Sequence, residues 1–161
     1  MAFRYQRILC PIDFDNNSMA ALDAAVDLAG QAGQVYLMHV VQMIMLGPET
    51  GGYIAAYDAE SKAARKKLEA VAKEKLGSIK HEVRLAVGEP ASAILAAIDK
   101  ISPDLVVMAT HGRKGVAHLF LGSVTERVVR ESPKPVLTIR PLAQGRKSRA
   151  RTKAPSASSR S

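Results

Sequence analysis

Five short apolar segments alternate along the chain with segments that carry apolar residues at helical spacing. The apolar segments are mostly continuous and rich in β-branched residues, as strands buried on both faces of a parallel sheet are. Because each pair of strands is separated by a helix-length connection, an α/β fold is predicted, with an open parallel sheet and helices on both faces. The predicted strands cover residues 7–12, 34–41, 81–87, 104–109 and 135–139.

Capping and breaking residues delimit the four predicted helices. An N-cap for the first is expected among residues 16–18, and the third begins at Pro90. The third strand alternates apolar and polar residues, which indicates an edge position. Residues 42–57 fit neither period and are predicted to form a long loop. The apolar stripes of the helices lie within residues 22–29, 64–76, 90–101 and 123–131.

Size and composition limit the chain to one globular domain. The 161 residues are 47% apolar and 24% charged, close to globular averages. No apolar run reaches the roughly 20 residues of a membrane helix, and no secretory signal is recognised at the N-terminus. Cys10 is the single cysteine, which excludes an intrachain disulfide and favours a reducing, cytoplasmic location.

Most of the net charge of +8 comes from the C-terminal segment. Residues 144–161 contain six bases and no acid, which leaves 17 bases against 15 acids in the remainder. A nucleic-acid groove within the fold is therefore not indicated. The expected organisation is an α/β domain over residues 1–141 and a basic, disordered tail over 142–161, able to bind polyanions weakly.

A glycine-containing loop follows the predicted strand 104–109 and leads into a predicted helix. The loop runs from Thr110 through Gly115 to Gly122, and Ser123 opens the helix. Free N–H groups and the positive end of the helix dipole favour an anion there, and glycine lets a phosphate approach the backbone. The spacing matches neither the Walker loop nor the dinucleotide motif G-x-G-x-x-G.

The loop and three further segments resemble the universal stress protein family, in its nucleotide-binding type. That family carries G-x2-G-x9-G-[ST], and here Ala109 replaces the first glycine of the pattern Ala109-x2-Gly112-x9-Gly122-Ser123. Pro11-Ile12-Asp13, His39-Val40 and the sequence VGEP at 87–90 also match. The resemblance covers about residues 4–141. It implies a Rossmann-like sheet of five parallel strands in the order 3-2-1-4-5, with about four helices.

The resemblance also implies a binding site for an adenine nucleotide, with ATP favoured and Mg²⁺ as an accompanying ion. The first strand end and the backbone of the second strand would approach adenine and ribose, and the glycine loop with the following helix would hold the phosphates. The methyl group of Ala109 would crowd the approach of the ribose and phosphate. The implied nucleotide-binding residues are Pro11, Ile12, Asp13, Val40, Ala109, His111, Gly112, Arg113, Gly115, Gly122, Ser123, Val124 and Thr125.

Structural roles compete with these assignments. Asp13 could instead cap the first helix, and Ser123 with Glu126 three residues later has the spacing of a capping box. No catalytic residue is assigned, because neither a nucleophile elbow nor a general base is recognised. No metal site is assigned either, because the four histidines lack a metal-binding spacing.

The function implied by the resemblance is that of a nucleotide-binding sensor or binding module in a stress response. Three alternatives remain open: an interaction protein with a vestigial pocket, a slow ATP hydrolase, and a cyclic-AMP binder. A homodimer is expected through the fifth strand, at residues 135–139, because a bare sheet edge tends to be paired or covered.

Overall fold

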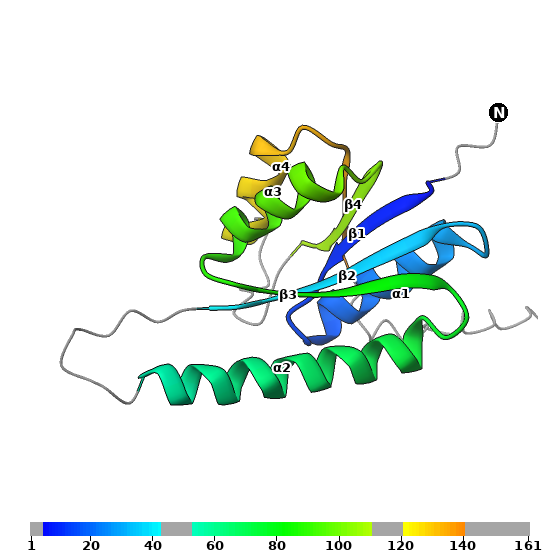
Figure 1. The fold of residues 1–161 in the computed structure, drawn as a ribbon. Coiled ribbons are helices and arrows are strands. Elements are labelled where there is room, and N and C mark those ends of the chain that lie inside the picture. Colours follow the sequence, from blue (N-terminus) through cyan, green and yellow to red (C-terminus); the bar gives the residue numbers. More distant parts are fainter. Residues whose placement is uncertain (1–4, 43–52, 111–120, 141–161) are drawn as a thin grey trace, which may run out of the picture.

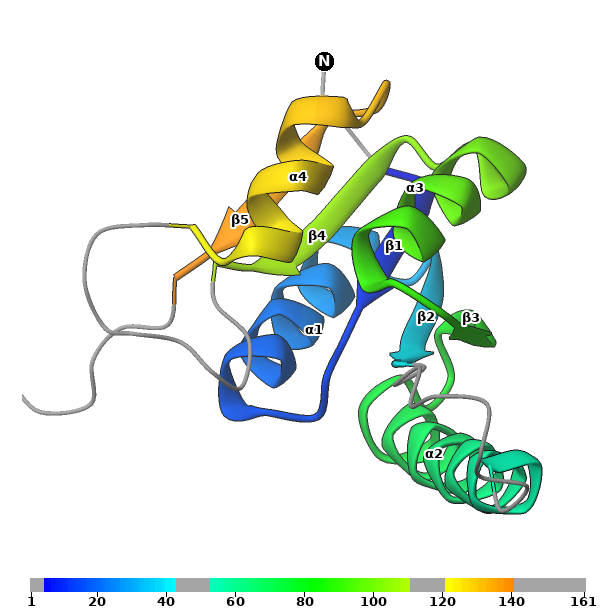
Figure 2. The same ribbon diagram turned by 90° about the vertical axis from the view of Figure 1, so that its left-hand side faces the viewer.

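The sheet forms as the sequence predicts. The computed structural model describes residues 5–42, 53–110 and 121–140. These residues form a parallel sheet in the order β3-β2-β1-β4-β5, of which Figure 1 labels the first four strands and Figure 2 labels β5. The α/β class and the strand order are therefore confirmed. The strands are β1 (Arg7–Pro11), β2 (Gln34–Val41), β3 (Lys80–Val87), β4 (Leu105–Ala109) and β5 (Val136–Ile139).

Helices cover both faces of the sheet (Figure 2). α1 and α2 pack on one face, and α3 and α4 pack on the other. α2 begins at Tyr53, so the loop predicted over 42–57 is wrong in its last five residues. No glycine or proline follows Gly52 until Gly77, and the intervening residues are good helix formers. The helices are α1 (Asn16–Ala29), α2 (Tyr53–Lys75), α3 (Pro90–Ile101) and α4 (Ser123–Glu131).

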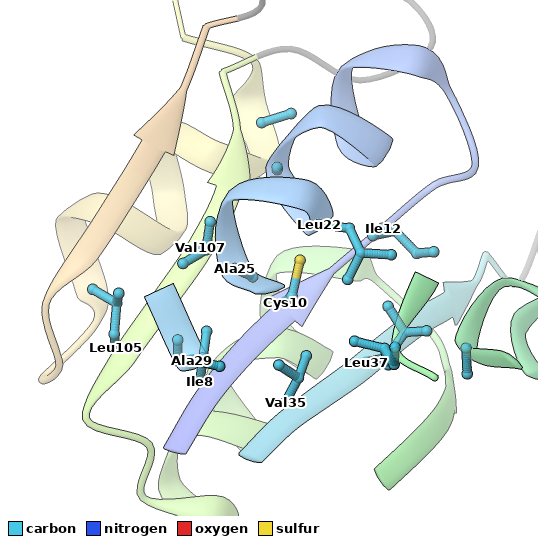
Figure 3. Close-up of a cluster of buried hydrophobic side chains, with 14 of the residues drawn as sticks. Ile8, Cys10, Ile12, Leu22, Ala25, Ala29, Val35, Leu37, Leu105 and Val107 are labelled. Atoms are coloured by element: carbon cyan, nitrogen blue, oxygen red, sulfur yellow. The ribbon is translucent and has the colours of Figure 1, made fainter. Parts of the chain in front are cut away.

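Alternate residues of the central strands supply two hydrophobic cores. Ile8 and Cys10 of β1 point toward α1 and α2, whereas Leu9 between them points toward α3 and α4. Figure 3 shows the first core, in which Leu22 and Ala25 of α1 are completely buried against the sheet. Burial, with a smaller contribution from Asp23, raises the pKa of the Cys10 thiol to about 12, so this cysteine is inert.

None of the described helices is long and apolar enough to cross a bilayer.

Candidate functional site

The adjacent strands β1 and β4 end side by side. Their parallel register pairs Leu9 with Val106, and continuing it places Asp13 level with Thr110. α1 follows β1 onto one face of the sheet, and α4 follows β4 onto the other. In open α/β sheets, ligands bind beyond the carboxyl ends of the strands where the connections diverge in this way. The candidate site lies at this divergence.

The start of α4 is tied to the end of β4. The Gly122 amide donates a 2.7 Å hydrogen bond to the Thr110 carbonyl, and the Thr125 hydroxyl donates a 2.8 Å bond to the Ala109 carbonyl. The chain that leaves the sheet at Thr110 therefore returns to it at Gly122. Thr125 is buried and Ser123 is exposed, so the first turn of α4 lies at the margin of the site.

Gly122, and not Ser123, is the N-cap of α4. The predicted capping box is therefore wrong, because the Gly122 carbonyl accepts the first hydrogen bond of the helix, from the Glu126 amide at 2.8 Å, and Ser123 lies already inside the helix. Among the described residues, no side chain accepts a hydrogen bond from the N–H groups of Ser123, Val124 or Thr125. These donors and the positive end of the helix dipole are suited to an anion.

The loop after β1 places Asp13 between two hydrogen-bonding neighbours. The Asp13 amide donates to the Ser18 hydroxyl at 3.2 Å, and the Asp13 carboxylate accepts from the Asp15 amide at 3.2 Å. Asp15 is the N-cap of α1, because its carboxylate accepts from the Ser18 amide at 2.7 Å. The alternative role of Asp13 as the helix cap is therefore wrong, as is an N-cap within residues 16–18.

Phe14 joins the ends of β1 and β2 to α2. Its backbone has a φ of 65°, which is rare for a bulky residue and indicates that the surroundings hold it in place. The Phe14 ring lies 4.4 Å from the His39 ring between centroids, and the Lys67 ammonium lies 4.4 Å from the Phe14 ring. His39 Nδ1–H donates to the Ile12 carbonyl at 2.8 Å. Neither Phe14 nor Lys67 belongs to a motif from which a role at this site could be predicted.

The described candidate residues lie at this one edge of the sheet. Pro11 ends β1, and the amide of the next residue, Ile12, donates a 2.8 Å hydrogen bond to the Met38 carbonyl of β2. Val40 lies near the end of β2, and Ala109 ends β4. Four candidates lie outside the described residues: His111, Gly112, Arg113 and Gly115.

The family of the chain follows from its sequence. A family model described as the universal stress protein family matches residues 4–140, which include every strand and helix of the sheet domain. The chain belongs to the universal stress protein family. Its α/β domain therefore has the architecture that the motifs around Asp13 and Gly122 imply.

Individual members of the universal stress protein family agree with this assignment. The protein MJ0577 of Methanocaldococcus jannaschii is 28% identical over 160 residues, covering 87% of this chain and 98% of the relative. Its solved structure has a TM-score of 0.79 to this one, at 27% identity, covering 87% of this chain and 99% of that one.

Two solved relatives contain adenine nucleotides. One is a universal stress protein in complex with cAMP, with a TM-score of 0.62 and 24% identity, covering 86% of this chain and 98% of that one. The other is a universal stress protein family member from Arabidopsis thaliana with AMP bound, with a TM-score of 0.59 and 18% identity, covering 86% and 93%. At these identities the two structures support the fold alone.

Asp15 provides a test of the loop after β1 in this universal stress protein. Partial burial raises the Asp15 pKa. The hydrogen bond from the Ser18 amide lowers this pKa, and the neighbouring Asp13 carboxylate raises it further, so the net shift is upward. When a carboxyl pKa is higher in the folded state than in the unfolded state, the free energy of unfolding decreases as the pH rises through that pKa. Asn keeps the capping oxygen without the charge.

We expect Asp15→Ala to lower the free energy of unfolding by about 1 kcal/mol, as the loss of an N-cap does. Asp15→Asn should equal or exceed the wild type at pH 7 and match it at pH 2, where the wild-type carboxyl is protonated. Urea unfolding at both pH values measures this. An Asn variant as unstable as the Ala variant would contradict the capping role.

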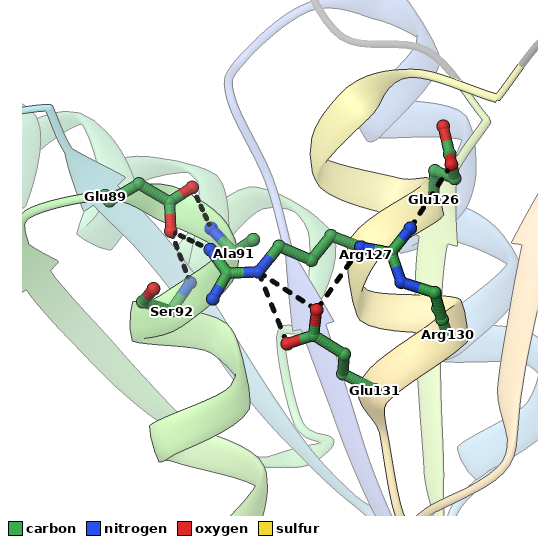
Figure 4. A network of polar contacts seen from close by, with 7 residues as sticks. All are labelled: Glu89, Ala91, Ser92, Glu126, Arg127, Arg130 and Glu131. Atoms are coloured by element: carbon green, nitrogen blue, oxygen red, sulfur yellow. Dashed lines mark hydrogen bonds and ion pairs between the residues drawn. The ribbon is translucent and has the colours of Figure 1, made fainter.

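A charged network joins α4 to α3 on the face opposite α1 (Figure 4). Glu89 caps α3 by accepting from the Ala91 amide at 3.0 Å and the Ser92 amide at 2.8 Å. Arg127 of α4 donates from Nη1 to the same carboxylate at 2.7 Å and pairs through Nε with Glu131 at 3.3 Å. The network helps to fix where α4, and with it the candidate anion site, lies on the sheet.

Glu89 should contribute a measurable, pH-dependent part of the stability. Hydrogen bonds from Ser92 and Ala91, with the charge of Arg127, lower its pKa from 4.5 to about 2. A lowered carboxyl pKa adds stability above pH 4.5, and that stability is lost as the pH falls toward 2. Glu89→Ala should cost about 1 kcal/mol at pH 7, as a lost cap does, and nothing near pH 2. Thermal unfolding across this range checks the prediction.

Glu126→Ala is the matched control, because within the described part of the chain Glu126 makes a single ion pair, with Arg130, and both side chains are exposed. Its cost should stay below about 0.5 kcal/mol at every pH. Equal losses in the two variants would show that Glu89 acts as an ordinary surface charge.

Proposed function

We propose that this universal stress protein binds an adenine nucleotide at the carboxyl edge of its sheet, between the ends of β1 and β4. The first turn of α4 carries the proposal, because it begins at Gly122 beside β4 and its N–H groups have no described side-chain acceptor. Such a turn binds phosphate without a dedicated basic side chain. Two proteins that share this fold were solved with cAMP and with AMP bound, so an adenine nucleotide is the ligand class that we propose to test.

The described residues suggest how such a ligand would lie. The phosphates would approach Gly122, Ser123 and the amides of Val124 and Thr125. Adenine and ribose would lie toward Asp13 and the backbone of Val40, near the ends of β1 and β2. The half-buried Asp13 carboxylate is suited to accept from ribose hydroxyls or from the adenine amino group.

ATP is the favoured nucleotide, with Mg²⁺ accompanying the triphosphate. The described residues contain no group of three His, Cys, Asp or Glu side chains that could hold a metal. The ion would therefore be held mainly by phosphate oxygens, as Mg²⁺ often is in nucleotide sites. Cyclic AMP is the second candidate, because its single phosphate needs less space beside the Ala109 methyl group.

Titration calorimetry on protein stripped of bound ligand tests the proposal. ATP, with and without Mg²⁺, should bind with a micromolar dissociation constant, near −8 kcal/mol. ADP, AMP and cyclic AMP in parallel titrations rank the phosphate requirement, and phosphate release over hours measures any slow hydrolysis. If no nucleotide gives heat or a melting shift at millimolar concentration, the pocket is vestigial and the protein acts through its surface.

We propose further that the protein is a cytoplasmic homodimer and acts as a sensor or binding module in a stress response. The domain over residues 1–141 would carry the nucleotide and the dimer contact. The basic segment 142–161 would be dispensable for folding, because it contains six bases, no acid and few apolar residues.

A further inference from the structure

The second edge of the sheet, opposite β5, is formed by β3. All eight residues of β3 pair with β2, and within the described part of the chain no strand lies on its other side. The Gly88 amide donates inward to the Val41 carbonyl at 3.0 Å. Because peptide groups alternate along a strand, the N–H and C=O groups of Val83, Leu85 and Val87 point away from β2. Such an edge can pair with another extended chain.

A groove of about 340 Å³ lies along this edge, between α3 and α2. Its lining includes the outward-facing residues Val83 and Leu85 of β3. On the α3 side it is bordered by three alanines, at positions 93, 96 and 97, whose small side chains leave room beside the strand. The size is at the lower end of the range for ligand pockets, roughly 300–1,000 Å³.

Three cations, one from each bordering element, line the groove. They are Arg65 of α2, Arg84 of β3 and Lys100 of α3, and none of the described residues that line the groove is acidic. Arg65 reaches Glu69 only at 3.8 Å between two exposed side chains, a pair that a ligand carboxylate can replace at little cost. Among the described acids, none forms an ion pair with Lys100.

Arg84 is held in place with part of its hydrogen-bonding capacity unused. Its Nη2 bonds to the Glu82 carboxylate at 2.7 Å, and its guanidinium lies 5.8 Å from the centre of the Tyr36 ring. Its Nε is buried and has no hydrogen-bond acceptor. The Arg84 side chain is nevertheless 30% exposed, so the outer N–H groups of its guanidinium can donate to a ligand carboxylate in the groove.

We propose that the β3 edge binds an extended acidic peptide segment of a partner protein, which adds a strand to the sheet. Main-chain hydrogen bonds to Val83, Leu85 and Val87 would provide affinity, and the three cations would select acidic side chains. This binding does not depend on nucleotide. The protein's own tail is a poor occupant because it is basic, and a second copy would bring its own three cations to the same edge.

A fluorescent peptide of the sequence Gly-Glu-Val-Glu-Val-Glu-Gly, blocked at both ends, tests the proposal by anisotropy on the full chain. Binding should be micromolar at low salt and weaken as salt rises. The double variant Arg65→Gln/Lys100→Gln should bind at least fivefold more weakly. The control Lys66→Gln/Lys73→Gln removes the same charge from exposed positions outside the groove and should leave affinity unchanged.

Two further measurements separate strand addition from simple charge attraction. The same peptide with its alternate amides N-methylated should fail to bind. Amide exchange at Val83 and Leu85 should slow with the unmodified peptide, while Arg84 and Ala86, already directed at β2, should not change. Equal binding of the methylated peptide, competition by millimolar inorganic phosphate alone, or self-association through β3 would each overturn the proposal.

Discussion

Gly122→Val is expected to weaken adenine-nucleotide binding by at least 100-fold. Gly122 is the N-cap of α4 and its amide is committed to the Thr110 carbonyl, so its Cα lies where a phosphate would approach the first turn. A valine side chain there would occupy space beside the N–H groups that the phosphate needs. The loss corresponds to about 2.7 kcal/mol of binding free energy.

The backbone of Gly122 makes this variant informative. Its φ of −60° and ψ of 149° are in the extended region that valine readily adopts, so the substitution adds bulk without forcing the chain. Because valine is a poorer N-cap than glycine, the variant is expected to lose up to about 1 kcal/mol of unfolding free energy, and it is suitable for the binding test as long as it remains folded. Circular dichroism and melting without ligand establish that the variant is folded before calorimetry.

Ser132→Val is the matched control, because it places valine at the opposite end of the same helix in a similar extended conformation. It should bind nucleotide as the wild type does. Asp13→Ala should give a milder loss of about threefold to tenfold, the effect of one hydrogen bond of roughly 0.5–1.5 kcal/mol. A folded Gly122→Val protein with wild-type affinity would show that the phosphates do not lie at α4.

The elements whose signals are local could be predicted from the sequence. Four strands follow from apolar runs bounded by turns, β3 follows from the alternation of apolar and polar residues, and α3 follows from Pro90 and its apolar stripe. Strand order could not be read from alternation and came from the family motifs. The first turn of α2 at Tyr53 was missed because its apolar stripe begins further along the helix.

Contacts between distant segments account for what the sequence could not predict at the site. Ser123 and Glu126 have the spacing of a capping box, but the N-cap is one residue earlier, at Gly122, whose amide is bonded to the distant Thr110 carbonyl. Similarly, Lys67 reaches Phe14 across more than 50 residues of sequence, and only the packing of α2 against β2 and β3 brings them together. Helix starts are sensitive to such tertiary hydrogen bonds, whereas strand positions are determined largely by burial.

Leu137→Lys is expected to convert a homodimer into a monomer. β5 forms the edge of the sheet beyond β4, and its carbonyls at Pro135 and Ile139 are bonded inward to β4. Alternation therefore directs the N–H and C=O groups of Val136 and Thr138 outward, where an antiparallel copy of β5 can pair with them across a two-fold axis. Leu137 lies between them with 37% of its surface exposed, which is unusual for a large apolar residue on a bare edge.

In a dimer with a two-fold axis through β5, the substitution would be present in both subunits at the contact. Each introduced lysine would therefore lie opposite the same lysine of the partner subunit. The dimer dissociation constant should therefore rise by at least 100-fold, through lost apolar burial and like-charge repulsion. Light scattering at micromolar concentration should give about twice the chain mass of 17.3 kDa for the wild type and the chain mass for the variant. Leu28→Lys, at a similarly exposed leucine on α1, should remain dimeric. A monomeric wild type, or a dimer that survives Leu137→Lys, would show that β5 is not the dimer contact.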